Sequence, residues 1–171
     1  QEQARLRAQG RYMGIGISSF VDSSAAMGWE SGTVRVDRGG KVTLLTGSSA
    51  HGQGHYTTFA QIVADVLAVP IDDVQVIHGD TAVVPVGVGT FGSRSAALGG
   101  SSALRAAERL KDKMRRIAAN LLEAGPEDIE LADGKFFVAG TPAKAIPFAH
   151  VAGASYFGQG LGSDLAPGLE E

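Results

Sequence analysis

The stretch that decides the fold is residues 33–67, TVRVDRGGKVTLLTGSSAHGQGHYTTFAQIVADVL. Its first half holds two β-prone runs, 33–36 and 42–45, on either side of the Gly-Gly turn at 37–41. Apolar, β-branched runs around such a turn predict an antiparallel hairpin. The second run leads into a glycine-rich loop at 47–55, and a helical pattern follows that loop. The stretch therefore predicts a strand–loop–helix unit built on a hairpin.

Two helices are predicted from apolar residues that recur every three or four positions. The first helix, near 56–68, carries its apolar face at Phe59, Ile62, Val63, Val66 and Leu67. The second helix, near 96–122, carries its apolar face at Leu104, Leu110, Met114, Ile117 and Leu121. Prolines end both patterns, at Pro70 and at Pro126.

Short strands are predicted on both sides of these helices. Residues 12–21 are apolar and β-prone, which predicts a buried strand, and alternation predicts another strand at 74–78. Two more strands are expected at 129–131 and 135–138, and a last helical turn at 147–152. Because strands and helices mix without strict alternation, the sequence favours an α+β fold, a mixed sheet with helices packed on one face, over a doubly wound parallel fold.

The length of 171 residues is enough for one domain with a substantial core. We expect residues 1–10 to end a preceding helix or to form a linker, and residues 11–152 to form the domain. Residues 153–171 contain several glycines and a proline, which predicts a linker toward a downstream segment.

Composition excludes several classes of function. The formal net charge of −3 gives no support for a nucleic-acid partner. The sequence has no cysteine, which excludes disulfides, thiolate zinc sites and iron–sulfur clusters within this chain and is compatible with a cytoplasmic protein. No apolar run approaches the ~20 residues of a membrane helix. The 24 glycines bunch in a few loops, which suggests backbone that must approach something closely.

The first glycine-rich loop, at 47–55, lies between a predicted strand and a predicted helix. A helix N-terminus has unpaired N–H groups and a partial positive charge, and glycines let backbone close in on a ligand, so the loop could cradle a phosphate. The amide of Gln53 adds both a donor and an acceptor. The loop matches neither the nucleotide-hydrolysing nor the dinucleotide-binding glycine motif. From spacing alone, a phosphate site and a simple turn remain equally open.

The second glycine-rich loop, at 87–95, also precedes a predicted helix. Thr90, Ser93 and Ser95 offer hydroxyls, and Arg94 could fork onto a phosphate or a carboxylate. The alternative for Arg94 is a surface ion pair. Two such loops in one small domain suggest a ligand with two polar ends, such as a diphosphate-linked cofactor.

Histidines do not point to a metal site. His51 and His55 are four residues apart, a spacing that can bind zinc on a helix. Gly52 and Gly54 lie between them and argue against regular helix, and no carboxylate is placed beside them as a general base. We therefore expect no metal ligand in this chain.

The loops together resemble a known family, the molybdopterin-binding large subunits of molybdenum hydroxylases, which include aerobic carbon monoxide dehydrogenases, xanthine dehydrogenases and aldehyde oxidases. The resemblance rests on the order and spacing of HGQGHYTTFAQI at 51–62, HGDT at 78–81 and GTFGSRS at 89–95. The flanking GRYMGIG at 10–16 and PGLE at 167–170 are similar as well, so the resemblance covers nearly the whole chain as a segment of that subunit.

The resemblance implies a fold like that of the molybdenum-cofactor-binding domain and a molybdenum–molybdopterin cofactor, in bacteria often the cytosine dinucleotide. Gln53 would hydrogen-bond the pterin, and Arg94 would support its loop or a phosphate. The implied cofactor-binding residues are His51, Gly52, Gln53, Gly54, His55, Thr90, Phe91, Gly92, Ser93, Arg94 and Ser95. His51 stands where carbon-monoxide-type members often carry glutamine.

The resemblance also implies what this chain lacks. The family's catalytic glutamate belongs to a later segment and its substrate-selecting loop to an earlier one, so the chain alone is expected to be inactive. The full enzyme would oxidise carbon monoxide, aldehydes or N-heterocycles with water-derived oxygen. It would pass electrons to iron–sulfur and flavin (FAD) subunits or domains and assemble as a dimer. The alternatives are a non-catalytic phosphate- or nucleotide-binding module and a structural assembly domain.

Overall fold

The structure is a computed structural model that describes residues 1–25 and 28–171. Its first sheet is built from β1 (Gly32–Val36), β2 (Val42–Thr46) and β3 (Val74–Ile77), in the order β1-β2-β3. The first pair is antiparallel and closes at Val36 opposite Val42, which confirms the predicted hairpin. The second pair is parallel. The sheet is therefore mixed.

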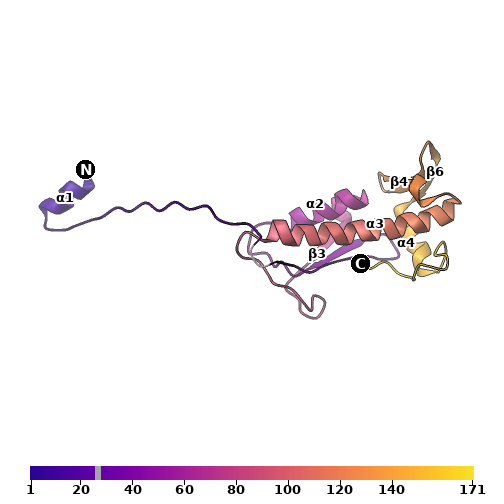
Figure 1. The fold of residues 1–171 in the computed structure, drawn as a ribbon, viewed down its shortest axis with the longest axis horizontal. Helices are drawn as coiled ribbons and strands as arrows, with labels where there is room; N and C mark the ends of the chain where they lie inside the picture. Colours follow the sequence, from indigo (N-terminus) through magenta and orange to yellow (C-terminus); the bar gives the residue numbers. More distant parts are fainter. Residues whose placement is uncertain (26–27) are drawn as a thin grey trace.

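Two helices lie side by side across this sheet (Figure 1). The shorter helix, α2 (His55–Leu67), connects the parallel strands β2 and β3 through η1 (Ile71–Asp73). The longer helix, α3 (Gly100–Leu122), packs against α2 and against β1. Leu67 of α2 and Leu110 of α3 are fully buried in the core between helices and sheet. This arrangement confirms the predicted α+β fold with helices packed on a mixed sheet.

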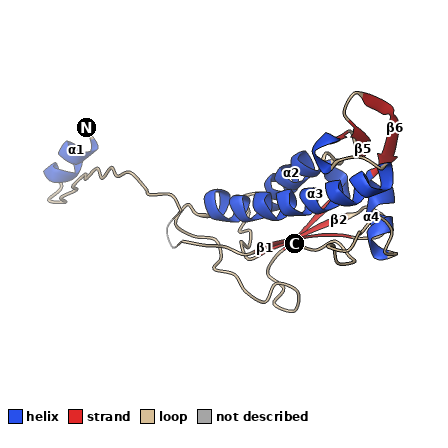
Figure 2. Cartoon of the chain, turned by 45° about the vertical axis from the view of Figure 1, so that its right-hand side comes forward, coloured by secondary structure: helices blue, strands red, loops and turns tan. Residues whose placement is uncertain are grey.

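A second sheet covers the far end of α3 (Figure 2). After η3 (Pro126–Asp128) it contains β4 (Ile129–Ala132), β5 (Lys135–Val138) and β6 (Thr141–Pro147), paired antiparallel in sequence order, and α4 (Phe148–Tyr156) follows. Strands β4 and β5 were predicted, whereas β6 was not. It carries prolines at both ends of a mostly exposed run, a composition tolerated only on an edge strand.

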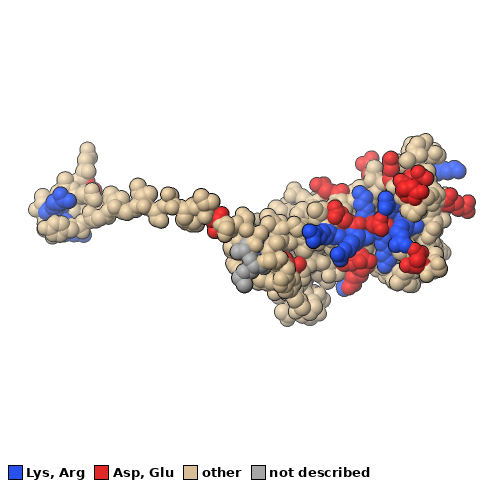
Figure 3. Space-filling view, in the orientation of Figure 1, with Lys and Arg blue, Asp and Glu red and all other residues tan. Residues whose placement is uncertain are grey.

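Lys and Arg side chains gather over α3, with Asp and Glu side chains among them (Figure 3). Arg109, Lys113 and Arg116 of this helix alternate with Glu108 and Asp112. The mixture of signs along one exposed helix face is that of a solvated surface. The apolar face of the same helix holds Leu110, Met114 and Ile117 in the core.

The predicted buried strand at 12–21 is wrong. The segment is extended, but no strand is assigned in the described residues before Gly32, and Tyr12, Ile17 and Val21 are exposed. It leads from α1 (Glu2–Ala8) to the rest of the domain without lying on it (Figure 1). An apolar, β-prone composition makes a strand only where a neighbouring edge supplies hydrogen-bond partners, and the described residues place no edge beside it.

The expected linker over 153–171 also differs from the structure. The helix α4 continues to Tyr156, and Leu161 and Leu169 are buried in the main core. The end of the chain then pairs with β1, where the Val34 N–H donates to the Glu171 carbonyl and the Val36 N–H to the Leu169 carbonyl. Glycines here shape turns between anchored residues rather than making the segment free.

Candidate functional site

The two glycine-rich loops cross at their glycines. A Cβ built on Gly47 would lie 2.5 Å from the Cα of Gly87, and a Cβ on Gly87 would lie equally close to the Cα of Gly47. Gly99 in turn lies against the first loop, since its Cβ would come within 2.5 Å of Ser48 Oγ. Backbones can approach this closely only where side chains are absent. The two loops therefore adjoin, although they are about 40 residues apart in the sequence.

The two loops lead into their helices through different backbone conformations. In the first loop, Gly54 adopts a left-handed φ of +78° and α2 starts at His55. In the second loop, Ser93 adopts φ +51°, which side chains other than asparagine and aspartate seldom do, and its hydroxyl donates to Asp22 at 2.8 Å. A π-helical turn, η2 (Ser95–Gly99), then leads into α3. π-Helical turns are rare in proteins, and those that do occur are often found at functional sites.

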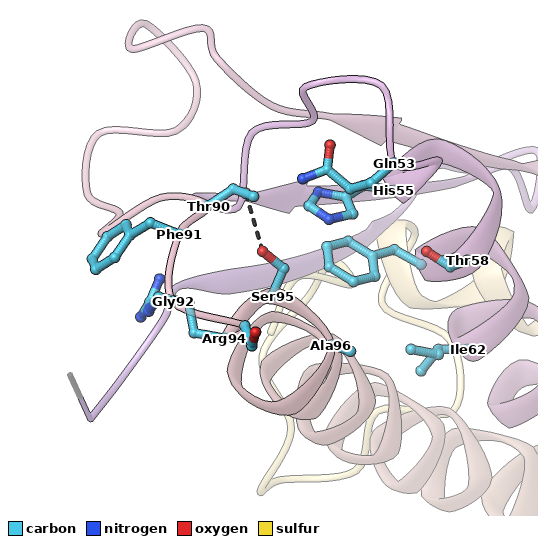
Figure 4. Close-up of a pocket in the computed structure, with 12 residues that line it drawn as sticks. Gln53, His55, Thr58, Ile62, Thr90, Phe91, Gly92, Arg94, Ser95 and Ala96 are labelled. Carbon is cyan, nitrogen blue, oxygen red and sulfur yellow. Dashed lines mark hydrogen bonds between the residues drawn. The ribbon is translucent and has the colours of Figure 1, made fainter. Parts of the chain in front are cut away.

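A cavity of about 540 Å³ lies between the loops (Figure 4). Gln53 and His55 face it from the first loop and the start of α2, and Thr90 and Ser95 face it from the second loop. The lining consists of Gln53, His55, Thr58, Phe59, Ile62, Thr90, Phe91, Gly92, Ser93, Arg94, Ser95 and Ala96. Its size is that of a typical small-molecule site, and its wall joins apolar residues with a few converging polar groups.

Three of the expected cofactor-binding residues lie outside this lining. His51, Gly52 and Gly54 are exposed on the outer part of the first loop. His51 still acts on the site, because its backbone N–H donates to the side-chain oxygen of Gln53 at 2.5 Å. A Cβ at Gly52 or Gly54 would meet nothing within 4 Å, so these glycines serve the backbone conformation, with φ of +103° and +78°.

The polar groups at the cavity are partly fixed in advance. His55 is buried, stacks on Phe59 and places Nδ1 at 3.1 Å from the Ser48 carbonyl. A carbonyl can only accept, so Nδ1 carries the proton of this hydrogen bond. Ser95 Oγ donates to Thr90 Oγ1 at 3.1 Å, as Figure 4 shows. A ligand would meet these groups already oriented.

Arg94 is fully buried and is not placed as a surface cation. Its Nη1 donates to Glu30 Oε2 at 2.8 Å and to the Gly89 carbonyl, and its Nη2 donates to the Trp29 carbonyl. Its guanidinium also lies over the ring of Phe91 at 5.3 Å from the centroid. Of the two partners that the sequence left open for Arg94, the structure therefore supplies a carboxylate, from within the chain itself.

Glu30 is the buried anion that Arg94 meets, and both side chains have zero exposure. Burial alone would raise the pKa of Glu30. Hydrogen bonds from the Val88 N–H, from Arg94 and from the Ser31 and Gly89 N–H groups outweigh burial, so the pKa of Glu30 lies below its usual value. Glu30 is therefore a carboxylate at neutral pH.

His78, the first residue of the HGDT motif at 78–81, lies beside α2. Its ring contacts the ring of Tyr56 at 4.5 Å between centroids, and its buried Nε2 has no hydrogen-bond partner among the described residues. Burial, together with the nearby His55 and His51, lowers the pKa of His78. The imidazole is therefore neutral at physiological pH.

Sequence reasoning missed Glu30 and the residues from α2 and η2 that complete the cavity wall. Thr58 and Ile62 lie one turn apart on α2, and Ala96 lies on η2. They carry no motif. For Glu30, a usable signal was the cation inside a glycine-rich loop, because an arginine there needs a nearby acid once the loop is buried. Nothing in the spacing says which acid that is.

Comparison with known proteins identifies the family of the chain. Residues 1–169 match the family described as molybdopterin cofactor-binding domain. The chain belongs to the molybdopterin cofactor-binding domain family. This domain family occurs in the large subunits of molybdenum-dependent oxidoreductases, so the resemblance read from the loop motifs is confirmed.

Three relatives illustrate the match. The chain is 44% identical, over 82% of its length, to the 6-hydroxypseudooxynicotine dehydrogenase complex subunit gamma of Paenarthrobacter nicotinovorans, covering 18% of that protein. It is 37% identical, over 99% of its length, to the carbon monoxide dehydrogenase large chain of Afipia carboxidovorans, covering 22%. The solved quinoline 2-oxidoreductase of Pseudomonas putida 86 superimposes with a TM-score of 0.79 at 42% identity, over 99% of this chain and 23% of that one. The chain thus spans about a fifth of the length of the relatives that it matches.

Proposed function

We propose that this chain forms one wall of the molybdopterin site of a molybdenum-dependent oxidoreductase, with the cytosine dinucleotide form of the cofactor. The observation that carries the proposal is the cavity where Gln53 and His55 from one loop meet Thr90 and Ser95 from the other. An amide, an imidazole and two hydroxyls offer both donors and acceptors, as the heteroatom edge of a pterin requires.

The residues present fit this cofactor through hydrogen bonding rather than through charge. Gln53 would pair with the pterin edge, and Thr90 and Ser95, with backbone N–H groups of residues 91–95, would contact the opposite side. Phe59 and Ile62 would exclude water beneath the ligand. Arg94, which pairs with Glu30, would support its loop. A module that bound phosphate through Arg94 would need this pair to break, so the phosphate-module alternative loses its main cation.

When bound, the cofactor supplies the oxidation chemistry, and the role of this chain is to hold, orient and shield it. We propose carbon monoxide, aldehydes or N-heterocycles as the substrate class of the whole protein, and iron–sulfur and flavin subunits or domains of a dimeric assembly as its partners. The catalytic carboxylate would come from outside these residues, so the 171-residue chain alone would show no turnover. No helix in the described part of the chain is long and apolar enough to cross a membrane.

The test is cofactor analysis of the complete protein that carries this chain, purified from a host that makes molybdopterin. We expect molybdenum and pterin in equal amounts, and release of a cytosine nucleotide on acid hydrolysis. Pterin with no nucleotide would reject the dinucleotide form. A protein that copurifies with nucleotide but with neither molybdenum nor pterin would reject the proposal as a whole.

A further inference from the structure

Glu30 collects hydrogen bonds from three segments that are far apart in the sequence. Its Oε1 accepts from the N–H groups of Ser31 at 2.9 Å and Val88 at 3.0 Å. Its Oε2 accepts from Ser48 Oγ at 3.2 Å, the Gly89 N–H at 3.0 Å and Arg94 Nη1 at 2.8 Å. One carboxylate therefore ties together the segment before β1 and both glycine-rich loops.

Every partner of this carboxylate among the residues that the structure describes is a donor, so an amide of the same shape does not fit. An amide in place of the carboxylate would turn one acceptor oxygen into an NH₂ group. In one orientation the NH₂ would face the N–H groups of Ser31 and Val88. In the other it would face Arg94 and Gly89. Both orientations leave buried donors unpaired, which costs far more than the loss of an exposed hydrogen bond.

The residues that Glu30 holds are bonded to, or in contact with, residues that line the cavity. Gly89, held by Glu30, precedes Thr90, whose hydroxyl accepts from Ser95. Arg94, held by Glu30, lies over the ring of Phe91. Thr90, Phe91 and Ser95 all line the cavity, whereas Glu30 does not appear in the described lining. Glu30 thus supports the wall from behind and would not touch a ligand.

We propose that Glu30 is a positioning residue that holds residues 88–95 in the conformation that binds the cofactor. The geometry alone supports the first part of this proposal, that Glu30 orders the loop. The second part, that the ordered loop retains the cofactor, rests on the proposed function. A loop rich in glycine, serine and threonine has little packing of its own, so its order depends on this buried anion.

The experiment compares wild type with Glu30→Gln in the complete protein that carries this chain. The matched control is Glu170→Gln, which removes the carboxylate of the half-exposed Arg35–Glu170 pair on the same sheet. Amide hydrogen exchange is measured by peptide over 86–96 and over the core strand β2, and pterin content is measured per chain. Ser48→Ala, which removes one of the five donors, is the milder variant to be judged in the same way if Glu30→Gln does not fold.

We expect Glu30→Gln to raise exchange about tenfold or more over 86–96 while β2 stays protected, and to weaken cofactor retention about tenfold, the usual effect of losing support behind a ligand-binding group. Glu170→Gln should change neither. Pterin content equal to wild type in Glu30→Gln, or exchange raised equally in β2 and the loop, would overturn the positioning role. A wild type without pterin would refute the proposed function instead, and the exchange comparison would still decide the role of Glu30 in ordering the loop.

Discussion

Gly47 and Gly87 touch through their backbones, and a Cβ on either would lie 2.5 Å from the Cα of the other. The same Cβ on Gly47 would also come within 2.4 Å of Glu30 Oε1. The contact holds the two loops together at the point from which each leads to the cavity. The distance between the two walls of the cavity therefore depends on residues 47 and 87 both being glycine.

Alanine at either glycine should separate the loops. We expect Gly47→Ala and Gly87→Ala each to destabilise the fold by about 1–3 kcal/mol, because the added methyl meets backbone that cannot move aside. The matched control is Gly14→Ala, whose Cβ would meet nothing within 4 Å. Thermal unfolding of the three variants checks this. A Tm for Gly47→Ala that equals that of Gly14→Ala would show that the crossing is looser than described.

Gln53→Ala should weaken cofactor retention without weakening the fold. Gln53 is exposed, and its side chain accepts only one hydrogen bond among the described residues, from the His51 N–H. A lost hydrogen bond to a buried ligand is worth roughly 0.5–1.5 kcal/mol. Gln61→Ala, at an exposed site on α2, serves as the control. Pterin content and Tm are measured together, and full pterin in Gln53→Ala would remove this residue from the site.

Arg94→Ala should damage both folding and retention. Removing it leaves the Glu30 carboxylate buried without its cation, a change that typically costs about 3–5 kcal/mol. Arg35→Ala breaks a half-exposed pair with Glu170 and should cost no more than about 1 kcal/mol. Chemical denaturation of the two variants compares them. Equal midpoints would mean that the buried pair contributes no more than the surface pair.

The lowered pKa of Glu30 predicts the direction of a pH effect. A carboxylate whose pKa is lower in the folded state stabilises the fold fully above the usual glutamate pKa of ~4.3, and the contribution is lost as pH falls through the lower folded pKa. The Tm difference between wild type and Glu30→Gln should therefore be constant from neutral pH down to about pH 5.5 and shrink below about pH 4.3. A difference that grows on acidification would have the wrong sign.

The sequence predicted the elements whose signals are local. The hairpin around residues 37–41 and the two helices carry strong period or turn patterns, and all three formed as expected. Residues 12–21 carry an equally strong β pattern, yet remain exposed. Composition says that a segment can be a strand, but only a neighbouring edge decides whether it is one. The same reasoning explains why β6 was not predicted. Its prolines are unfavourable in a strand, but the edge of β5 supplies the hydrogen-bond partners that allow one to form.

At the site, the sequence located the loops but not their internal bonding. The glycines and hydroxyls at 87–95 indicate a ligand loop because their chemistry is local. The partner of Arg94 is 64 residues away, and nothing in the spacing distinguishes Glu30 from the other acids. Cavity-lining residues on α2, such as Thr58, were missed for a related reason. Whether a residue of this helix lines the cavity depends on how α2 is rotated about its axis.

Residues 169–171 cover an edge of the first sheet that would otherwise be open. Strand β1 is an edge strand, and Leu169 and Glu171 pair with its outer backbone at Val36 and Val34. Without them the chain would present a row of unsatisfied N–H and C=O groups beside an apolar core, a template for intermolecular pairing and aggregation. Because residues 169–171 cover this edge, we expect that replacing Glu171 with proline, which cannot donate the backbone hydrogen bond to Val34, lowers solubility before it lowers the Tm.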